Sequence, residues 1–169
     1  FGRMVVAKRR SLFEITPVST TFSVRTLVSG IGSINHSAVI AADNDIYFVS
    51  ERGVHSLLMT DKFGELETGY LSYPIQDYFQ DNIDFGRAGN MRSIYVPELN
   101  LYLLAATKKG SVRNDVVLGY NFVLKEWFRF DENISAMAKY VDPLDGRKTK
   151  VLVADDSGRL GILDTRRND

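Results

Sequence analysis

The feature that most constrains this sequence is a long series of short apolar runs, rich in β-branched and aromatic residues and separated by turn residues. Runs of this kind are typical of β-strands, and only one stretch has the period of an amphipathic helix. A parallel α/β sheet is excluded, because it needs a helix between successive strands. The pattern predicts an all-β fold with strands at Met4–Ala7, Ser11–Thr16, Ser23–Leu27, Ser37–Ala41, Ile46–Ser50, Val54–Met59, Met91–Val96, Leu101–Ala106, Asp115–Phe122, Glu126–Phe130, Ala136–Val141, Lys150–Ala154 and Arg159–Asp164.

Turn residues indicate where the strands form hairpins. Glu51-Arg52-Gly53, Lys108-Lys109-Gly110 and Asp156-Ser157-Gly158 each place a glycine where a tight β-turn often requires a positive φ angle. Lys8-Arg9-Arg10 occupies the equivalent place near the start of the chain. The sequence therefore predicts a series of similar hairpins.

These hairpins form an internal repeat. Each copy consists of an apolar strand, a polar turn and a second strand. Three copies are Val5–Phe13, Phe48–Ser56 and Val153–Gly161, and Leu103–Gly110 begins a fourth. The copies recur every 40 to 60 residues or so, near the period of about 40–50 residues in propeller blades. The repeat predicts a partial β-propeller of about three to four blades, as a single domain over residues 1–169 or a fragment of a larger propeller. Because a propeller ring normally has four to eight blades and the first residue is not Met, we expect a piece of a longer chain.

One segment, at about residues 72–85, is predicted to be a helical insertion between blades. Pro74 suits a first helical turn, and Ser72 is a candidate N-cap for the helix over Tyr73–Asp84. The flanking segments Phe63–Gly69 and Phe85–Asn90 are predicted to be loops. The helical spacing i, i+3, i+4 and i+8 places four apolar residues on one face: Ile75, Tyr78, Phe79 and Ile83.

Composition excludes several classes of protein. The chain has 169 residues, with 21 Lys and Arg balanced by 21 Asp and Glu, so it lacks the basic excess of a dedicated nucleic-acid-binding domain. It contains no Cys, which excludes disulfides, thiolate metal sites and a cysteine nucleophile. No apolar run approaches the roughly 20 residues that a membrane-spanning helix requires.

The sequence contains no recognisable arrangement of catalytic residues. Its two histidines, His36 and His55, have no motif partners and are expected to be structural or surface residues. We expect no metal and no cofactor. The paired carboxylates all fall at predicted turns, where Asp commonly accepts hydrogen bonds from nearby backbone amides: Asp43/Asp45, Asp131/Glu132, Asp142/Asp145 and Asp155/Asp156.

Basic and aromatic residues have two interpretations each. If the hairpin turns face one rim, Lys108, Lys109 and Arg113 could gather there and contact DNA or an acidic partner, whereas solvated turns that protect sheet edges are the simpler interpretation. Trp127 is expected to anchor the packing of one blade on the next, with a sugar-stacking platform as the alternative.

The segments together resemble a known family. Three segments are similar to sequence segments of the β-propeller proteins of the bacteriophage tail or neck. They are Met4-Val5-Val6-Ala7 with the following strand, Val28-Ser29-Gly30-Ile31-Gly32-Ser33, and Asp45 to Val54. Tyr120-Asn121-Phe122-Val123-Leu124-Lys125-Glu126-Trp127 fits a later phrase of that family, and the helical insertion falls where the family has one. The resemblance extends from about Met4 to Leu163.

The resemblance implies a structural, non-enzymatic protein of the virion, made in the host cytoplasm. Such proteins form a ring or nozzle below the portal and adaptor of short-tailed phages, often as hexamers, around a channel that passes or retains DNA without sequence specificity. We accordingly expect contacts with other copies and with neighbouring virion proteins through Ile75, Tyr78 and Phe79 of the insertion. A kelch-like or lectin-like binding propeller and a propeller glycosidase are the alternatives.

Overall fold

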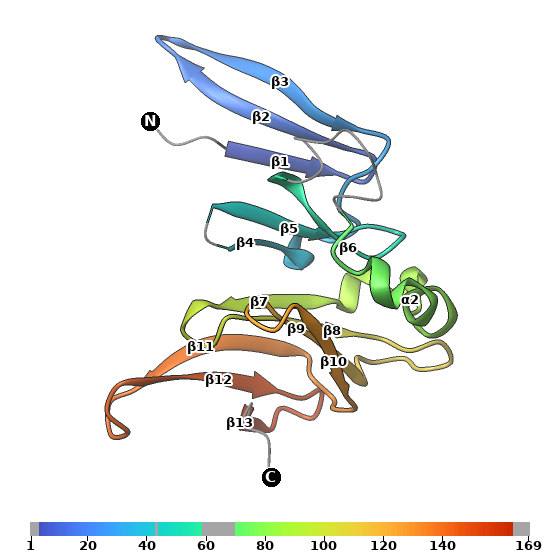
Figure 1. Cartoon of the computed structure of the whole chain (residues 1–169), viewed down its shortest axis with the longest axis vertical. Coiled ribbons are helices and arrows are strands. Elements are labelled where there is room, and N and C mark those ends of the chain that lie inside the picture. Colours follow the sequence, from blue (N-terminus) through green and yellow to red (C-terminus); the bar gives the residue numbers. More distant parts are fainter. Residues whose placement is uncertain (1–3, 43, 59–69, 164–169) are drawn as a thin grey trace. The chain divides into compact units, whose positions relative to one another are not determined.

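The computed structural model of the chain describes residues 4–42, 44–58 and 70–163 (Figure 1). Within these residues the chain is mostly β, as predicted, and each predicted strand has its counterpart. The predicted loop Phe63–Gly69 lies outside the described residues. The strands are β1 (Met4–Lys8), β2 (Ser11–Val18), β3 (Thr21–Ser29), β4 (Val39–Ala42), β5 (Asp45–Val49), β6 (Val54–Ser56), β7 (Arg92–Val96), β8 (Leu101–Ala106), β9 (Val116–Asn121), β10 (Glu126–Phe130), β11 (Ala136–Asp142), β12 (Lys148–Ala154) and β13 (Leu160–Leu163).

The described strands form four small sheets, and each sheet is an antiparallel meander of strands consecutive in sequence. Three sheets have three strands, in the orders β1-β2-β3, β4-β5-β6 and β11-β12-β13. The remaining sheet has four, in the order β10-β9-β8-β7. Gly53, Gly110 and Gly158 lie in the connections β5–β6, β8–β9 and β12–β13 and adopt positive φ, as the sequence predicts, with angles of 140°, 85° and 83°.

The chain divides into two compact units, which we call unit 1 (Phe1–Asp81) and unit 2 (Asn82–Asp169). In unit 1, the sheet β1–β3 packs on the sheet β4–β6 through a core of buried apolar side chains, with Val5 and Ala7 at its edge. The alternation of strand residues explains this, since Val5 and Ala7 point to the same face as Leu12, the cross-strand neighbour of Ala7. The buried members of this core are Leu12, Val28, Ile31, Phe48 and Leu57.

Unit 2 is built in the same way from the sheets β7–β10 and β11–β13. β8 is buried along its whole length, as expected for a central strand covered on both faces. The core that joins the two sheets consists of Ile94, Val96, Leu103, Ala105, Val117, Ile134 and Val151. Each unit therefore contains two sheets that hide one apolar face against each other.

The predicted insertion is helical, in two pieces. A 3-10 turn at η2 (Tyr73–Ile75) leads into α2 (Gln76–Asn82), with Pro74 in the first turn as predicted. Ser72 does not cap this helix; its Oγ instead accepts a hydrogen bond of 2.9 Å from the backbone N–H of Val54. The hydroxyl therefore joins the insertion to strand β6.

Three further 3-10 helices differ from the predicted strands and loops. The segment Phe85–Asn90, predicted to be a loop, forms η3, and Asp84 caps it by accepting a hydrogen bond from the backbone N–H of Gly86. η1 (His36–Ala38) takes the first residues of a predicted strand, because the side chain of Asn35 caps it. η4 (Pro97–Leu99) connects β7 to β8, in the stretch between two predicted strands.

Candidate functional site

Equivalent hairpin turns of successive sheets lie together in each unit. In unit 1, Arg9 in the β1–β2 turn donates a hydrogen bond of 2.7 Å from Nε to Oε1 of Glu51 in the β5–β6 turn. In unit 2, Nη1 of Arg113 in the β8–β9 loop lies 3.3 Å from Oδ2 of Asp156 in the β12–β13 turn. The turns that the repeat makes equivalent therefore meet at one rim within each unit, joined by an ion pair.

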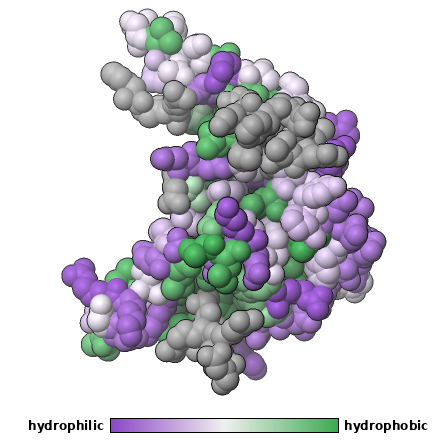
Figure 2. All heavy atoms as spheres, in the orientation of Figure 1, coloured by the Kyte–Doolittle hydropathy of each residue, from purple (hydrophilic) through white to green (hydrophobic). Residues whose placement is uncertain are grey.

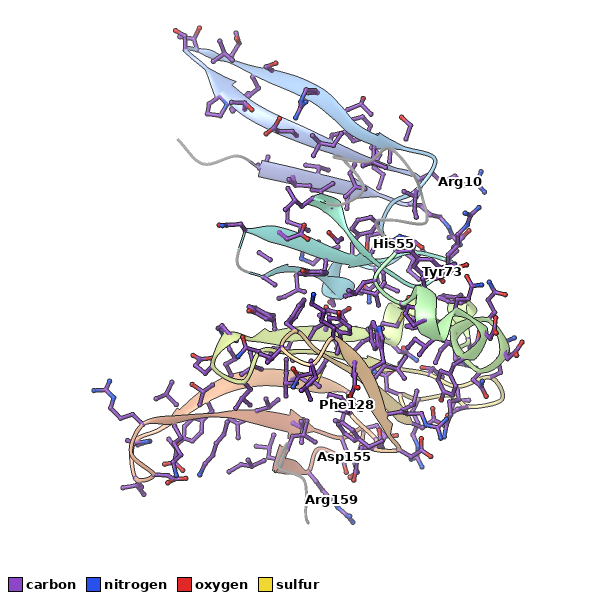
Figure 3. The ribbon with its side chains drawn as sticks, viewed as in Figure 1. Arg10, His55, Tyr73, Phe128, Asp155 and Arg159 are labelled. Atoms are coloured by element: carbon purple, nitrogen blue, oxygen red, sulfur yellow. The ribbon has the colours of Figure 1, made fainter. Side chains whose placement is uncertain are left out.

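A pocket of about 290 Å³ opens between the two turns of unit 1. We call it the arginine pocket, and its lining residues are Arg9, Arg10, Gly30, Ile31, Ser50, Glu51 and Arg52. Figure 3 shows Arg10 at the turn end of the β1–β3 sheet, on the same side of unit 1 as His55. Three arginines and one glutamate are among the lining residues, so the residues around this pocket have a net positive charge.

The basic cluster predicted to contact DNA or an acidic partner is largely engaged within unit 2. Nζ of Lys108 lies 3.4 Å from Oδ1 of Asp131 and 3.9 Å from Oδ2 of Asp115. Arg113 is paired with Asp156 as described above. Lys109 has an exposed side chain, and its backbone N–H donates to the carbonyl of Asn82. Nearby acids therefore balance much of the positive charge that the sequence places here.

The three residues predicted to contact partners differ in exposure. Ile75 and Tyr78 are half-buried, whereas Phe79 is completely buried. A side chain that solvent cannot reach contributes to packing inside the chain, so Phe79 is not part of an available surface in this structure. The helical period identified the apolar face correctly but not which of its residues the rest of the chain covers.

The two histidines have structural or surface positions, as the sequence predicts. His36 is exposed. His55 is buried between two aromatic rings, with centroids 5.4 Å from Phe48 and 4.6 Å from Tyr70. Its Nε2 lies 2.8 Å from Oγ of Ser50. Burial, and to a smaller extent the positive charge of Arg52, lowers the pKa of His55 to about 4.

Several of the described carboxylates accept hydrogen bonds in turns or form ion pairs. Oδ1 of Asp155 accepts hydrogen bonds from the hydroxyl of Ser157 and from the backbone N–H groups of Ser157 and Arg159, and these bonds, that of the hydroxyl most of all, lower the pKa of Asp155. Oδ1 of Asp142 likewise accepts from the backbone N–H of Leu144. This is the turn chemistry predicted for them. Asp43 lies outside the described residues, and no group of His, Asp and Glu side chains suited to a metal ion occurs among those described.

Trp127 packs within its own sheet. It is the cross-strand neighbour of Tyr120, whose ring centroid lies 5.2 Å away, and Tyr120 is in turn the neighbour of Tyr102. Trp127 also meets the buried ring of Tyr102 edge to face. These contacts give Trp127 a packing role, but within the sheet β7–β10 and not between sheets as predicted, and they leave the sugar-stacking alternative without support of its own.

The outer face of β1–β3, away from the core of unit 1, is apolar and exposed. Cross-strand pairing aligns Met4 with Ile15 and Ile15 with Val24 in one row. Phe22 is 72% exposed and Val24 is 62% exposed. Figure 2 shows hydrophobic surface near the end of the β2–β3 hairpin. The apolar members of this outer face are Met4, Val6, Phe13, Ile15, Phe22 and Val24.

The outer face of β11–β13 is apolar and exposed next to the β12–β13 turn, and carries the charged residues Asp142, Lys148 and Lys150 toward the β11–β12 turn. Val151 points into the core of unit 2, so its sequence neighbour Leu152 points the other way, in register with Ala138 and Ile162. Leu160 is 83% exposed and Ile162 is 52% exposed. Sequence reasoning missed both outer faces, because alternation identifies two faces of a strand but not which face the chain covers.

The chain matches no family model, and no curated protein is significantly similar to it in sequence. Among the described residues, every helix is too short or too polar to cross a lipid bilayer.

Proposed function

We propose that the four sheets are successive blades of a β-propeller and that the chain is a structural, non-enzymatic protein. In this proposal it forms part of a ring or nozzle in the tail or neck of a short-tailed phage. It acts by packing against copies of itself and against neighbouring virion proteins around a DNA channel. The observation that supports the proposal best is the pair of exposed apolar outer faces on the sheets β1–β3 and β11–β13.

The blade interpretation is supported by the equivalence of the strands. A propeller blade is an antiparallel meander of four strands, and the sheet β7–β10 has this order. The hairpins β1–β2, β5–β6, β8–β9 and β12–β13 correspond to one another in the sequence repeat. Within each unit, one sheet packs face to face on the next and equivalent turns share a rim. Blades that follow one another around an axis have both properties.

The exposed faces give the proposed contact its driving force. A meander sheet buries its second apolar face only when another sheet covers it, and monomeric proteins rarely leave large contiguous apolar patches in water. The partner that we propose is a second copy of this chain. In that contact, the outer face of β11–β13 in one copy covers the outer face of β1–β3 in the next.

Both faces suit this partner because each carries cross-strand rows of aliphatic or aromatic side chains, such as Met4–Ile15–Val24 and Ala138–Leu152–Ile162. Two different faces that meet head to tail form a heterologous interface, which closes into a ring when its rotation permits. The proposed assembly is thus a repetition, between copies, of the sheet stacking that each unit contains.

The test is a mass measurement by light scattering over a range of concentrations. We expect the chain to associate, and we expect Val24→Asp to weaken association at least about 10-fold, since burying an unpaired carboxylate costs more than about 1.4 kcal/mol. The matched control is Ser23→Asp, which adds the same charge on the same strand. Ser23 is exposed and points to the opposite face, so this variant should associate like the wild type. Circular dichroism checks that both variants fold. A wild-type chain that stays monomeric, or a Val24→Asp variant that associates like the wild type, would refute the proposal.

A further inference from the structure

The arginine pocket of unit 1 holds positive charge that nearby acids do not balance. Arg9 is paired with Glu51, and the two charges offset each other. Arg10 and Arg52 also line the pocket, and neither lies within 4.0 Å of a carboxylate among the residues that the structure describes. The pocket therefore presents two guanidinium groups that are available to an anion.

The positions of these two groups are set by the fold. The backbone N–H of Gly30 donates a hydrogen bond of 2.9 Å to the carbonyl of Arg10, which fixes the β1–β2 turn against the end of β3. The backbone N–H of Arg52 donates a hydrogen bond of 2.9 Å to Oγ of the buried residue Ser50. Both turns are thus anchored at the backbone, while the guanidinium groups remain exposed at the rim.

We propose that this pocket is an anion-binding site that takes a phosphate group between Arg10 and Arg52. The planar guanidinium group matches phosphate oxygens in a bidentate geometry. The charges of Arg9 and Glu51 cancel, so Arg10 and Arg52 leave a net charge of +2 at the pocket. This charge complements a phosphate dianion or two successive diesters of a polynucleotide backbone. A carboxylate carries a single charge and would leave one guanidinium group unbalanced.

The pocket is a better phosphate site than the basic cluster predicted from the sequence. Lys108 and Arg113 already have acidic partners, so an incoming phosphate would compete with Asp131 and Asp156. Arg10 and Arg52 have no such competitor among the described residues. This inference does not depend on the proposed assembly, since every lining residue of the pocket belongs to unit 1.

The experiment is calorimetric titration of the full chain at low salt with two probes, inorganic phosphate and a DNA duplex of about 12 base pairs. We expect at least one probe to bind. Arg10→Ala and Arg52→Ala should each weaken its binding about 10-fold or more, in line with hydrogen bonds to charged groups. The matched control, Arg25→Ala, removes an arginine of unit 1 that is paired with Glu14, and it should bind like the wild type.

The two probes distinguish the source of the phosphate. Binding of inorganic phosphate alone indicates a free phosphate or a phosphomonoester, whereas salt-dependent binding of the duplex indicates a polynucleotide backbone. Arg52→Lys separates bidentate recognition from simple charge, because lysine keeps the charge without the planar fork; its affinity should fall below that of the wild type. Failure of both probes to bind, or an equal loss in Arg25→Ala, would overturn the inference. Association measured by light scattering stays the separate test of the proposed function.

Discussion

Lowering the pH from 7 to 5 should destabilise unit 1, because His55 is held neutral in its interior. The side chain is 1% exposed and lies between the rings of Phe48 and Tyr70. Its Nε2 faces Oγ of Ser50, and its Nδ1 has no hydrogen-bond partner among the described residues. A protonated ring would therefore carry a buried N–H with no acceptor, close to the positive charge of Arg52.

The size of the effect follows from the shift in pKa. The pKa of His55 falls from 6.5 to about 4 on folding, so the unfolded chain binds the proton more tightly than the folded chain. The stability that the neutral ring contributes is complete above pH 6.5 and is lost as the pH falls through the window between 6.5 and 4. At 1.36 kcal/mol for each pKa unit, the free energy of unfolding should fall by about 2 kcal/mol between pH 7 and pH 5.

The assay is urea unfolding followed by circular dichroism at pH 7 and pH 5, for the wild type and for His55→Phe. Phenylalanine keeps a ring between the two aromatic neighbours but cannot titrate, so most of the pH dependence should disappear in that variant. His36→Gln, which changes an exposed ring, is the matched control and should keep the wild-type pH dependence. Titration of the ring protons by NMR reports the pKa directly. An equal loss of stability in the wild type and in His55→Phe, or an NMR pKa near 6.5, would refute the reasoning.

Three further predictions concern buried packing and buried hydrogen bonds. An added Cβ at Gly119 would overlap the Phe128 ring, so one of the two side chains must shift and Gly119→Ala should destabilise unit 2 by about 1–3 kcal/mol. Phe128→Leu in the same chain should relieve part of the loss, and urea unfolding of the two single variants and the double variant measures the coupling. Phe79→Ala should cost about 3–5 kcal/mol in thermal unfolding, because the ring is fully buried, and a loss under 1 kcal/mol would contradict that burial. Asn114→Ala should cost about 2 kcal/mol, because the amide donates to the carbonyls of Asn90 and Ile134; unchanged unfolding would show that those carbonyls find other donors.

The strands could be predicted because their signals are local. Alternating apolar residues and a glycine with positive φ in the turn identify a hairpin such as β5–β6 without knowledge of the rest of the chain. The short 3-10 helices were missed although they also have a local signal. Asp84 and Asn35 are typical N-cap residues, and both accept a hydrogen bond from the turn that follows.

The candidate sites were harder to predict because they depend on distant residues. Asp131 pairs with Lys108, 23 positions away in the sequence, and Asp156 pairs with Arg113, 43 positions away. No local sequence pattern indicates ion pairs between residues so far apart. The arginine pocket had a partial signal, since the turns that contain Arg10 and Arg52 are equivalent in the repeat. The repeat suggests that those turns share a rim, but it does not indicate which arginines on that rim lack an acidic partner.

Electron microscopy of the associated chain tests the central claim most directly, namely that these sheets are blades stacked through their apolar faces. We predict closed rings with a central opening, in which the outer face of β1–β3 lies against another sheet. Particles in which that face stays open to solvent, or in which the strands close into a single barrel, would contradict the account.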